Sequence, residues 1–141
     1  MPLLSENDRK ALVEELSALT DPVTLVFFTQ TLGCDTCLQT REILDEVAAL
    51  SDKLTVEEVN FLLDKEKVEA YAVDKVPAIA LVGSKDTGIR FYGTPSGYEF
   101  MSLIDAILLV STGDSRLSPE SRALVAAVDR PMNIQVFVTP T

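Results

Sequence analysis

Apolar and polar residues alternate in blocks along this chain, and the period within each block predicts a helix or a strand. In residues 5–19, leucines recur at helical spacing after Ser5, a residue type that favours helix N-caps, and Asp21-Pro22 ends the pattern. Residues 23–29 form a nearly continuous run of β-branched and aromatic side chains, which is typical of a strand buried on both faces. We therefore expect a helix followed by a central strand.

The later blocks continue this alternation of helices and strands. We expect a helix after Cys37, a strand over 54–60, a short helix capped by Asp64, strands at 78–82 and 89–92, and a helix over 98–110. The segment from Gly83 to Gly88 has the composition of a turn, so the last two strands form a hairpin. Strands that alternate with helices indicate an α/β domain.

Near its end the chain begins to repeat itself. Ser118 and Pro119 start another helical block, and a proline break then leads to the apolar run 134–139, as Pro22 leads to 23–29. A Thr-x-Thr sequence ends both runs, about 110 positions apart. We expect the opening helix and strand of a second unit, of which the chain holds only the start. The alternative is a coincidental helix and strand that complete the first sheet.

Composition and charge narrow the class of protein. The chain has 141 residues, of which 47% are apolar, enough to bury the core of one ordinary domain. Its net charge of −10 would repel nucleic acids and anionic membranes, so neither is expected as a partner. The sequence shows no secretory leader pattern and no apolar run near the roughly 20 residues that span a bilayer. We expect a soluble, cytoplasmic protein.

The chain contains no histidine and two cysteines, Cys34 and Cys37. The absence of histidine excludes Ser-His-Asp and Cys-His nucleophilic pairs and every histidine-based metal site. With two thiols, a tetrahedral zinc site would need carboxylate ligands or a second chain. We therefore expect neither a metal nor a cofactor.

The position of the two cysteines favours redox chemistry. They follow the strand 23–29 and open a helical block, where residues three apart lie about 5 to 6 Å from each other, a separation that a disulfide tolerates. A sulfur at the helix N-cap meets backbone N–H groups and the positive end of the helix dipole, which lower its pKa. The carboxylate of Asp35 opposes thiolate formation. The pair can open and close without unfolding the protein.

Three features together resemble the thioredoxin superfamily: Cys34-x-x-Cys37 after a strand, Val76-Pro77 before the next core strand, and Gly93 ahead of the closing helix. The leading helix, the segment 93–100 and the repeated start are similar to the two-unit, glutaredoxin-like protein disulfide oxidoreductases of thermophilic and anaerobic microbes. The resemblance implies an α/β, thioredoxin-like three-layer fold with a mixed central sheet flanked by helices. Residues 1–113 would form this unit, and 114–141 the linker, helix and first strand of an incomplete second one.

The resemblance also implies a function, thiol-disulfide exchange with protein thiols and disulfides, without a cofactor. Cys34 would be the attacking thiol and Cys37 the resolving thiol, and Pro77 would be a cis proline that lies against the pair. One alternative is an electron-relay or docking domain that serves a flavoprotein disulfide reductase or a peroxiredoxin. Another is an interaction module with structural cysteines. A homodimer formed through the edge strand 134–139 is a further expectation.

The sequence also departs from thioredoxins. Thioredoxins carry Trp before the first cysteine and Gly-Pro between the two, whereas Leu32-Gly33 and Asp35-Thr36 stand here. Their buried aspartate and neighbouring lysine fall near Phe27 and Glu58. Glu58 is the nearest candidate proton acceptor, although a solvated strand residue is the favoured interpretation. The reduction potential and the direction of exchange do not carry over.

Overall fold

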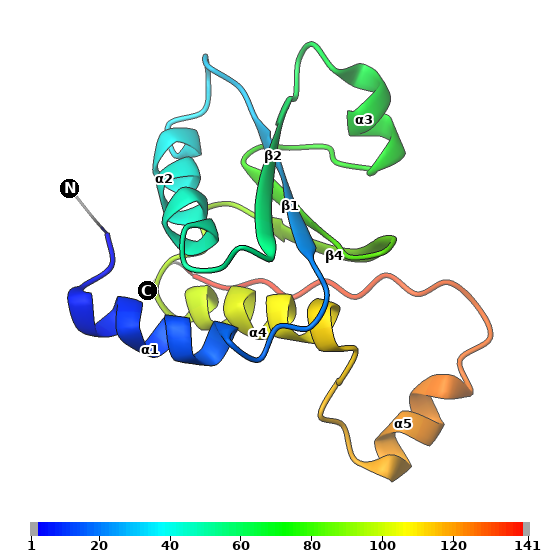
Figure 1. Cartoon of the computed structure of the whole chain (residues 1–141). Helices are drawn as coiled ribbons and strands as arrows, with labels where there is room; N and C mark the ends of the chain where they lie inside the picture. The colour runs from blue at the N-terminus through cyan, green and yellow to red at the C-terminus, as the bar shows by residue number, and fades with distance from the viewer. Residues whose placement is uncertain (1–2, 140–141) are drawn as a thin grey trace.

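A four-stranded sheet in the order β2-β1-β3-β4 organises the protein (Figure 1). The computed structural model describes residues 3–139 of the chain. Strand β1 (Val23–Thr29) runs parallel to β2 (Leu54–Asn60) and antiparallel to β3 (Ala78–Val82), which in turn pairs antiparallel with β4 (Asp86–Tyr92). The sheet is therefore mixed, and β1 is a central strand, as its run of apolar residues predicts.

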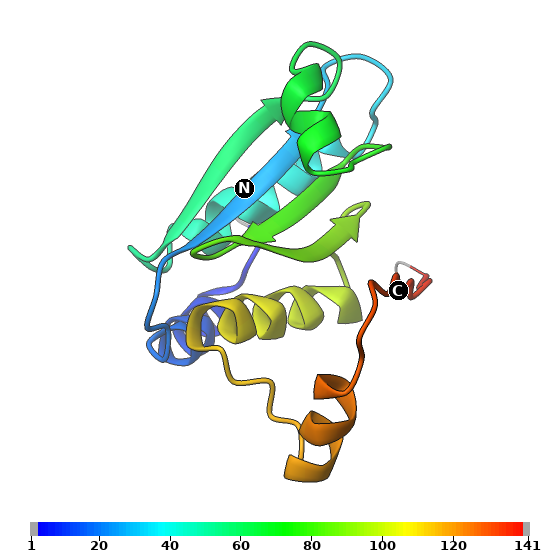
Figure 2. The same cartoon turned by 90° about the vertical axis from the view of Figure 1, so that its right-hand side faces the viewer.

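Helices cover both faces of the sheet (Figure 2). On one face the main apolar core joins three helices to the sheet: α1 (Glu6–Leu16), α2 (Cys37–Ala48) and α4 (Tyr98–Thr112). On the other face, a smaller cluster is closed by Val68 and Tyr71, which belong to α3 (Lys65–Ala70) and its C-cap. The predicted three-layer α/β architecture is confirmed.

Strand β1 supplies both cores because its side chains alternate between the two faces. Leu25 and Phe27 lie in the core under α1, α2 and α4, whereas Val26 and Phe28 lie in the core under α3. All four side chains are buried. Each such burial stabilises the fold by about 1.5–3 kcal/mol. The strand that leads into the cysteine motif is therefore held firmly on both faces.

The N-terminal caps of the first and third helices agree with the sequence. Ser5 caps α1 in a reciprocal box, in which its side chain accepts from the backbone N–H of Asp8 and the Asp8 carboxylate accepts from the backbone N–H of Ser5. The side chain of Asp64 caps α3 by accepting from the N–H of Lys67. Both caps satisfy donors that a helix start leaves without partners.

The end of α4 is fastened to the connection between α1 and β1 by Ser111. Its hydroxyl oxygen accepts the backbone N–H groups of Thr20 (2.9 Å) and Asp21 (3.0 Å), and the hydroxyl donates to the carbonyl of Asp21 (2.7 Å). The Thr20 hydroxyl donates to the Ser111 carbonyl at 2.9 Å. Because Ser111 is buried, this side chain replaces water for two backbone donors.

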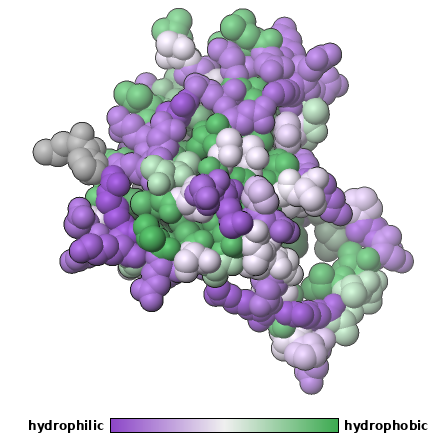
Figure 3. Space-filling model, in the orientation of Figure 1, coloured by the Kyte–Doolittle hydropathy of each residue, from purple (hydrophilic) through white to green (hydrophobic). Residues whose placement is uncertain are grey.

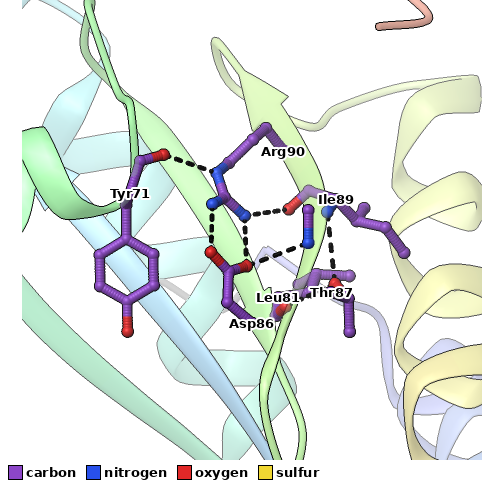
Figure 4. A network of polar contacts seen from close by, with 7 residues as sticks. Tyr71, Leu81, Asp86, Thr87, Ile89 and Arg90 are labelled. Carbon is purple, nitrogen blue, oxygen red and sulfur yellow. Dashed lines mark hydrogen bonds and ion pairs between the residues drawn. The ribbon is translucent and has the colours of Figure 1, made fainter. Parts of the chain in front are cut away.

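A polar network holds the hairpin of β3 and β4 (Figure 4). The Arg90 guanidinium donates to both carboxylate oxygens of Asp86, at 2.8 and 2.6 Å, and to the Tyr71 carbonyl at 3.1 Å. The Thr87 hydroxyl donates to the Leu81 carbonyl at 2.7 Å. Strand β4 begins at Asp86, three residues earlier than the expected strand 89–92, and these bonds hold its first residues against the rest of the hairpin.

The segment 134–139 does not form the strand that its apolar run predicts. Helix α5 (Pro119–Ala126) forms with Ser118 as its cap, as expected, but residues 129–139 contain no strand. The apolar side chains of Ile134 and Phe137 are exposed, Phe137 to 88%. A strand needs a neighbouring strand for its backbone hydrogen bonds, and none of the described strands pairs with this segment. The edge strand expected to join two copies is thus missing; Pro140 and Thr141 lie outside the described residues.

None of the helices within residues 3–139 combines the length and the apolar character that crossing a membrane requires.

Candidate active site

The two cysteines are joined in a disulfide between the end of β1 and the start of α2. Their Cα atoms are 5.5 Å apart, within the range that a disulfide allows. Cys34 is half-buried, whereas Cys37 is only 4% exposed. A reaction partner therefore reaches the sulfur of Cys34 more easily than that of Cys37.

The position of Cys34 differs from the sequence expectation by two residues. Helix α2 begins at Cys37 with Thr36 as its N-cap, so Cys34 lies ahead of the cap and not at it. Asp35 and Thr36 form a turn that brings Cys34 back toward the helix. The first backbone N–H groups of α2 still point toward the end of the helix at which Cys34 lies.

The loop before Cys34 is shaped by Gly33 and Gln30. The Gln30 side-chain amide donates to the Leu32 carbonyl at 2.8 Å. Gly33 has φ +74°, and a Cβ added there would lie 3.3 Å from Nε2 of Gln30. Both observations favour glycine at this position, because a side chain would be strained and crowded.

Pro77 lies at the same end of the sheet as the cysteines. The Val76–Pro77 peptide bond is cis, and Pro77 is buried. The next residue, Ala78, pairs with Phe28 near the end of β1, where the cysteine loop begins. The Pro77 carbonyl accepts the Gly93 N–H at 2.9 Å. The structure thus brings all three predicted site residues to one end of the sheet.

Two threonines that the sequence analysis did not single out contact the cysteine motif. Thr40 is fully buried, and its hydroxyl lies 2.8 Å from both the Thr36 carbonyl and the Thr94 hydroxyl. The Thr94 hydroxyl lies 3.5 Å from the same carbonyl. Thr94 is 54 residues from Thr40, so no local sequence pattern could have linked them.

A groove runs from the disulfide along β1 and β2. Besides the cysteines, it is lined by side chains that include Phe27, Thr29, Leu38, Arg41, Glu58 and Asn60. Arg41 and Glu58 form an ion pair across it. Arg41 also donates through Nε to Asp45 at 2.9 Å. Hydrogen bonds to Asp45 and then to Glu58 raise the pKa of Arg41 above its ordinary value, so Arg41 remains charged.

Glu58 partly matches the favoured interpretation of a solvated strand residue. Its side chain is 51% exposed, but it lies in the groove beside the cysteines and is paired with Arg41. Its neighbour Glu57 points to the other face of the sheet, where it pairs with Lys67 of α3. The two adjacent glutamates are therefore both partly exposed and ion-paired, but on opposite faces of the sheet.

Exposed leucines surround the cysteine end of the sheet. Leu32 and Leu38 flank the motif, and Leu62 and Leu63 follow β2. Because β1 and β2 are parallel, the loops after them leave the same edge, as Figures 1 and 2 show. The same end of the space-filling view carries protruding apolar side chains (Figure 3). We call these four residues the leucine rim.

No protein-family model matches the sequence. A probable thioredoxin of Methanothermobacter thermautotrophicus is 36% identical over 73 residues, which cover 51% of this chain and 81% of that relative. The chain belongs to the thioredoxin superfamily. Its Cys34–Cys37 disulfide in a thioredoxin-like fold supports a thiol-disulfide oxidoreductase or a redox domain like that of AhpF.

Two solved structures support the same superfamily fold over most of the chain. The NTD_N/C domain of alkylhydroperoxide reductase AhpF from Enterococcus faecalis has a TM-score of 0.82 and 29% identity, over 90% of this chain and 62% of that one. A protein disulfide oxidoreductase from Aeropyrum pernix has a TM-score of 0.77 and 25% identity, over 87% and 54%. The thioredoxin-like chain thus matches about half to two thirds of these longer chains.

A longer relative places a similar unit within a larger enzyme. The alkyl hydroperoxide reductase AhpF of Staphylococcus epidermidis is 29% identical over 120 residues, which cover 82% of this chain and 21% of that protein. This chain therefore spans about a fifth of that relative.

Proposed function

We propose that this unit exchanges disulfides with protein substrates, with Cys34 as the attacking thiol and Cys37 as the resolving thiol. The observation that carries the proposal is the unequal burial of the two sulfur-bearing residues across one disulfide. Cys34 is half-buried and reachable, whereas Cys37 is buried beneath it at the start of α2. An incoming disulfide then meets Cys34 first, and Cys37 is held where it can attack only Cys34.

The proposed cycle moves two electrons. In the reduced protein, the Cys34 thiolate attacks one sulfur of the substrate disulfide; a new S–S bond forms, and the other substrate sulfur leaves as a thiolate that takes up a proton. The Cys37 thiol then loses its proton, and its thiolate attacks the Cys34 sulfur of the mixed disulfide. The substrate leaves as a dithiol, and the Cys34–Cys37 disulfide is restored. With a dithiol substrate, the same steps run in reverse.

Pro77 completes the proposed site as a positioning residue. Proline has no N–H, so residue 77 offers no backbone donor at the cysteine end of the sheet. Its carbonyl is already engaged by Gly93. Position 77 therefore adds no hydrogen-bond donor that would compete for the sulfurs.

The leucine rim favours proteins as the substrates. Exposed Leu32, Leu38, Leu62 and Leu63 lose unfavourable contact with water when a protein surface covers them. Each buried leucine contributes roughly 1.5–3 kcal/mol at most to such a contact. A small charged thiol would cover little of this apolar surface.

The test is reduction of insulin with dithiothreitol as the electron source. The chain is expected to accelerate precipitation of the insulin B chain, and Cys34→Ser is expected to abolish the effect. Cys37→Ser should instead accumulate a mixed disulfide through Cys34, visible by mass spectrometry as an adduct. Absence of both catalysis and adduct would refute the proposal.

The second candidate is an electron-relay domain, favoured by the likeness to the alkyl hydroperoxide reductase AhpF. In this case the disulfide would accept electrons from a flavoprotein disulfide reductase and pass them to a peroxiredoxin. The insulin assay separates the two functions, because a relay is slow with insulin but fast with its partner. Addition of a flavoprotein reductase and a peroxiredoxin from the same source organism would then restore rapid turnover.

The third candidate is an interaction module whose cysteines are structural. A structural pair resists alkylation after mild reduction, because its thiols stay buried and protonated. Rapid modification of Cys34 at neutral pH excludes this candidate.

We further propose that residues 1–113 form the redox unit and that 114–141 begin a second unit. Helix α5 contributes no buried residue, and α4 ends at Gly113 in a left-handed cap. Truncation after Gly113 should therefore leave the unfolding temperature and the exchange rate unchanged. A large loss of stability would place α5 within the first unit.

A further inference from the structure

The backbone carbonyl of Thr36, within the cysteine motif, accepts two hydrogen bonds from Thr40 and lies near a second hydroxyl, that of Thr94. It accepts the N–H of Thr40 at 3.0 Å and the hydroxyl of Thr40 at 2.8 Å, and the Thr94 hydroxyl lies 3.5 Å away. The N–H bond is the ordinary first bond of helix α2. The hydroxyl groups are an addition that a helix start does not require.

The order of the hydroxyl bonds follows from the number of protons. A hydroxyl has one proton to donate. If the Thr40 proton goes to the Thr36 carbonyl, the short 2.8 Å contact between the two hydroxyls requires Thr94 to donate to Thr40. The result is a chain of hydrogen bonds from Thr94 through Thr40 to the Thr36 carbonyl. Hydrogen bonds in such a chain strengthen one another.

The same peptide unit carries the N–H of Cys37. In a trans peptide the C=O and N–H point in opposite directions. Because the Thr36 carbonyl points into α2 toward Thr40, the Cys37 N–H points out of the N-terminal end of the helix, where Cys34 lies. Donors on the carbonyl fix this peptide plane and make its N–H a stronger donor.

We propose that Thr94 and Thr40 are positioning residues that set the acidity of the Cys34 thiol by orienting and polarising the Thr36–Cys37 peptide. A more strongly polarised N–H stabilises the thiolate over the thiol, so Cys34 attacks faster near neutral pH. The inference rests on the proposed function only in taking Cys34 as the attacking thiol.

The loop that carries Thr94 also contacts the Pro77 side of the site. Its neighbour Gly93 donates its N–H to the Pro77 carbonyl at 2.9 Å. The connection between β4 and α4 therefore touches both the Pro77 strand and the cysteine helix. Thr94 is the side chain through which this connection reaches the motif.

The test compares Thr94→Val with Thr94→Ser in the full chain. Valine keeps the shape of threonine but removes the hydroxyl, whereas serine keeps the hydroxyl. After reduction, the rate of iodoacetamide alkylation of Cys34 is measured from pH 5 to pH 9. We expect Thr94→Val to lower the rate at pH 6 about threefold and to move the pH profile upward, and Thr94→Ser to restore both within about 1.5-fold. Thr40→Val should act in the same direction with a larger effect.

Thr112→Val is the matched control, because the Thr112 hydroxyl makes a similar 2.8 Å bond to the Leu108 carbonyl in α4, away from the cysteines. Its alkylation profile should equal that of the natural protein. An unchanged profile in Thr94→Val, or an equal change in Thr94→Val and Thr94→Ser, overturns the proposal. Circular dichroism checks that each variant is folded. If the natural chain fails to reduce insulin but these profiles shift as expected, the proposed function falls and this inference stands.

Discussion

Arg41 and Glu58 form an ion pair across the groove that holds both cysteines. Arg41 comes from the helix that follows the motif, and Glu58 comes from the strand beside β1. Thioredoxins resemble this chain in fold, yet the position near Glu58 carries a lysine in that family. The charge beside the disulfide is therefore balanced here by a pair of side chains.

We predict that Arg41→Gln slows Cys34 alkylation at pH 7 by about two- to fivefold. The substitution leaves the Glu58 carboxylate unbalanced in the groove, and a nearby negative charge disfavours a thiolate. Glu58→Gln should act in the opposite direction, and the double variant should lie close to the natural protein. The measurement is the alkylation rate as a function of pH.

Glu57→Gln provides the control for this charge effect. Glu57 is adjacent in sequence and also ion-paired, but with Lys67 on the face of the sheet away from α2. Its removal should leave the alkylation profile unchanged. An equal effect of Glu57→Gln and Glu58→Gln would show that only the net charge of the protein matters.

Asp35→Asn is predicted to lower the pKa of the Cys34 thiol. Asp35 is exposed and adjacent to Cys34. Its carboxylate repels a thiolate on Cys34 over a short distance, and solvent screens this repulsion only in part. Alkylation titrated against pH reports the change, and Asp52→Asn, in an exposed turn ahead of β2, serves as the control. A pKa that stays constant or rises in Asp35→Asn would contradict this account.

Ser111→Ala should lower the free energy of unfolding by about 1–3 kcal/mol. The substitution leaves the N–H groups of Thr20 and Asp21 without their buried acceptor. Chemical denaturation measures the loss. Ser102→Ala, at an exposed position of the same helix, should change stability by less than about 0.5 kcal/mol.

The free energy of unfolding should depend on the charge of Asp86 at acid pH. The hydrogen bond from Arg90 lowers the pKa of Asp86 below its ordinary 3.8, in opposition to a smaller effect of burial, and the Gly88 N–H adds to the lowering. Because the pKa is lower in the folded state, the contribution is fully present above about pH 4 and is lost as the pH falls through the folded pKa. Asp86→Asn should cost about 0.5–1 kcal/mol at pH 7, a figure reduced for solvent screening of this partly exposed pair.

The measurement is the free energy of unfolding of the natural protein and of Asp86→Asn at pH 7, 4 and 2. The difference between them should shrink toward the lowest pH. A difference that remains constant over this range would mean that the carboxylate charge does not contribute.

Local signals in the sequence predicted much of the fold. The cap at Ser5, the buried run of β1 and the cap at Asp64 each depend on neighbouring residues, and each is present in the structure. The cysteine pair and Val76-Pro77 were found for the same reason, since each is a short motif next to a strand. Elements whose cause lies within a few residues are visible in the sequence.

Features that depend on distant partners were not predictable in this way. The contact between Thr40 and Thr94 and the bonds of Ser111 join residues more than 50 positions apart. The segment 134–139 also depends on a distant partner: its pattern favours a strand, but a strand forms only where another strand accepts its hydrogen bonds, and none of the described strands does so. Sequence pattern reports the preference of a segment and not the presence of its partner.

The exposed apolar segment has a consequence for the behaviour of concentrated solutions. Residues 131–139 carry no charged side chain, and several of their side chains are β-branched or aromatic, a composition that supports pairing between molecules. The overall charge of −10 keeps molecules apart, but this repulsion acts over only about 10 Å at 0.1 M salt and less at higher salt. The protein should therefore stay dispersed in dilute buffer and self-associate as salt is added, the reverse of ordinary salting-in.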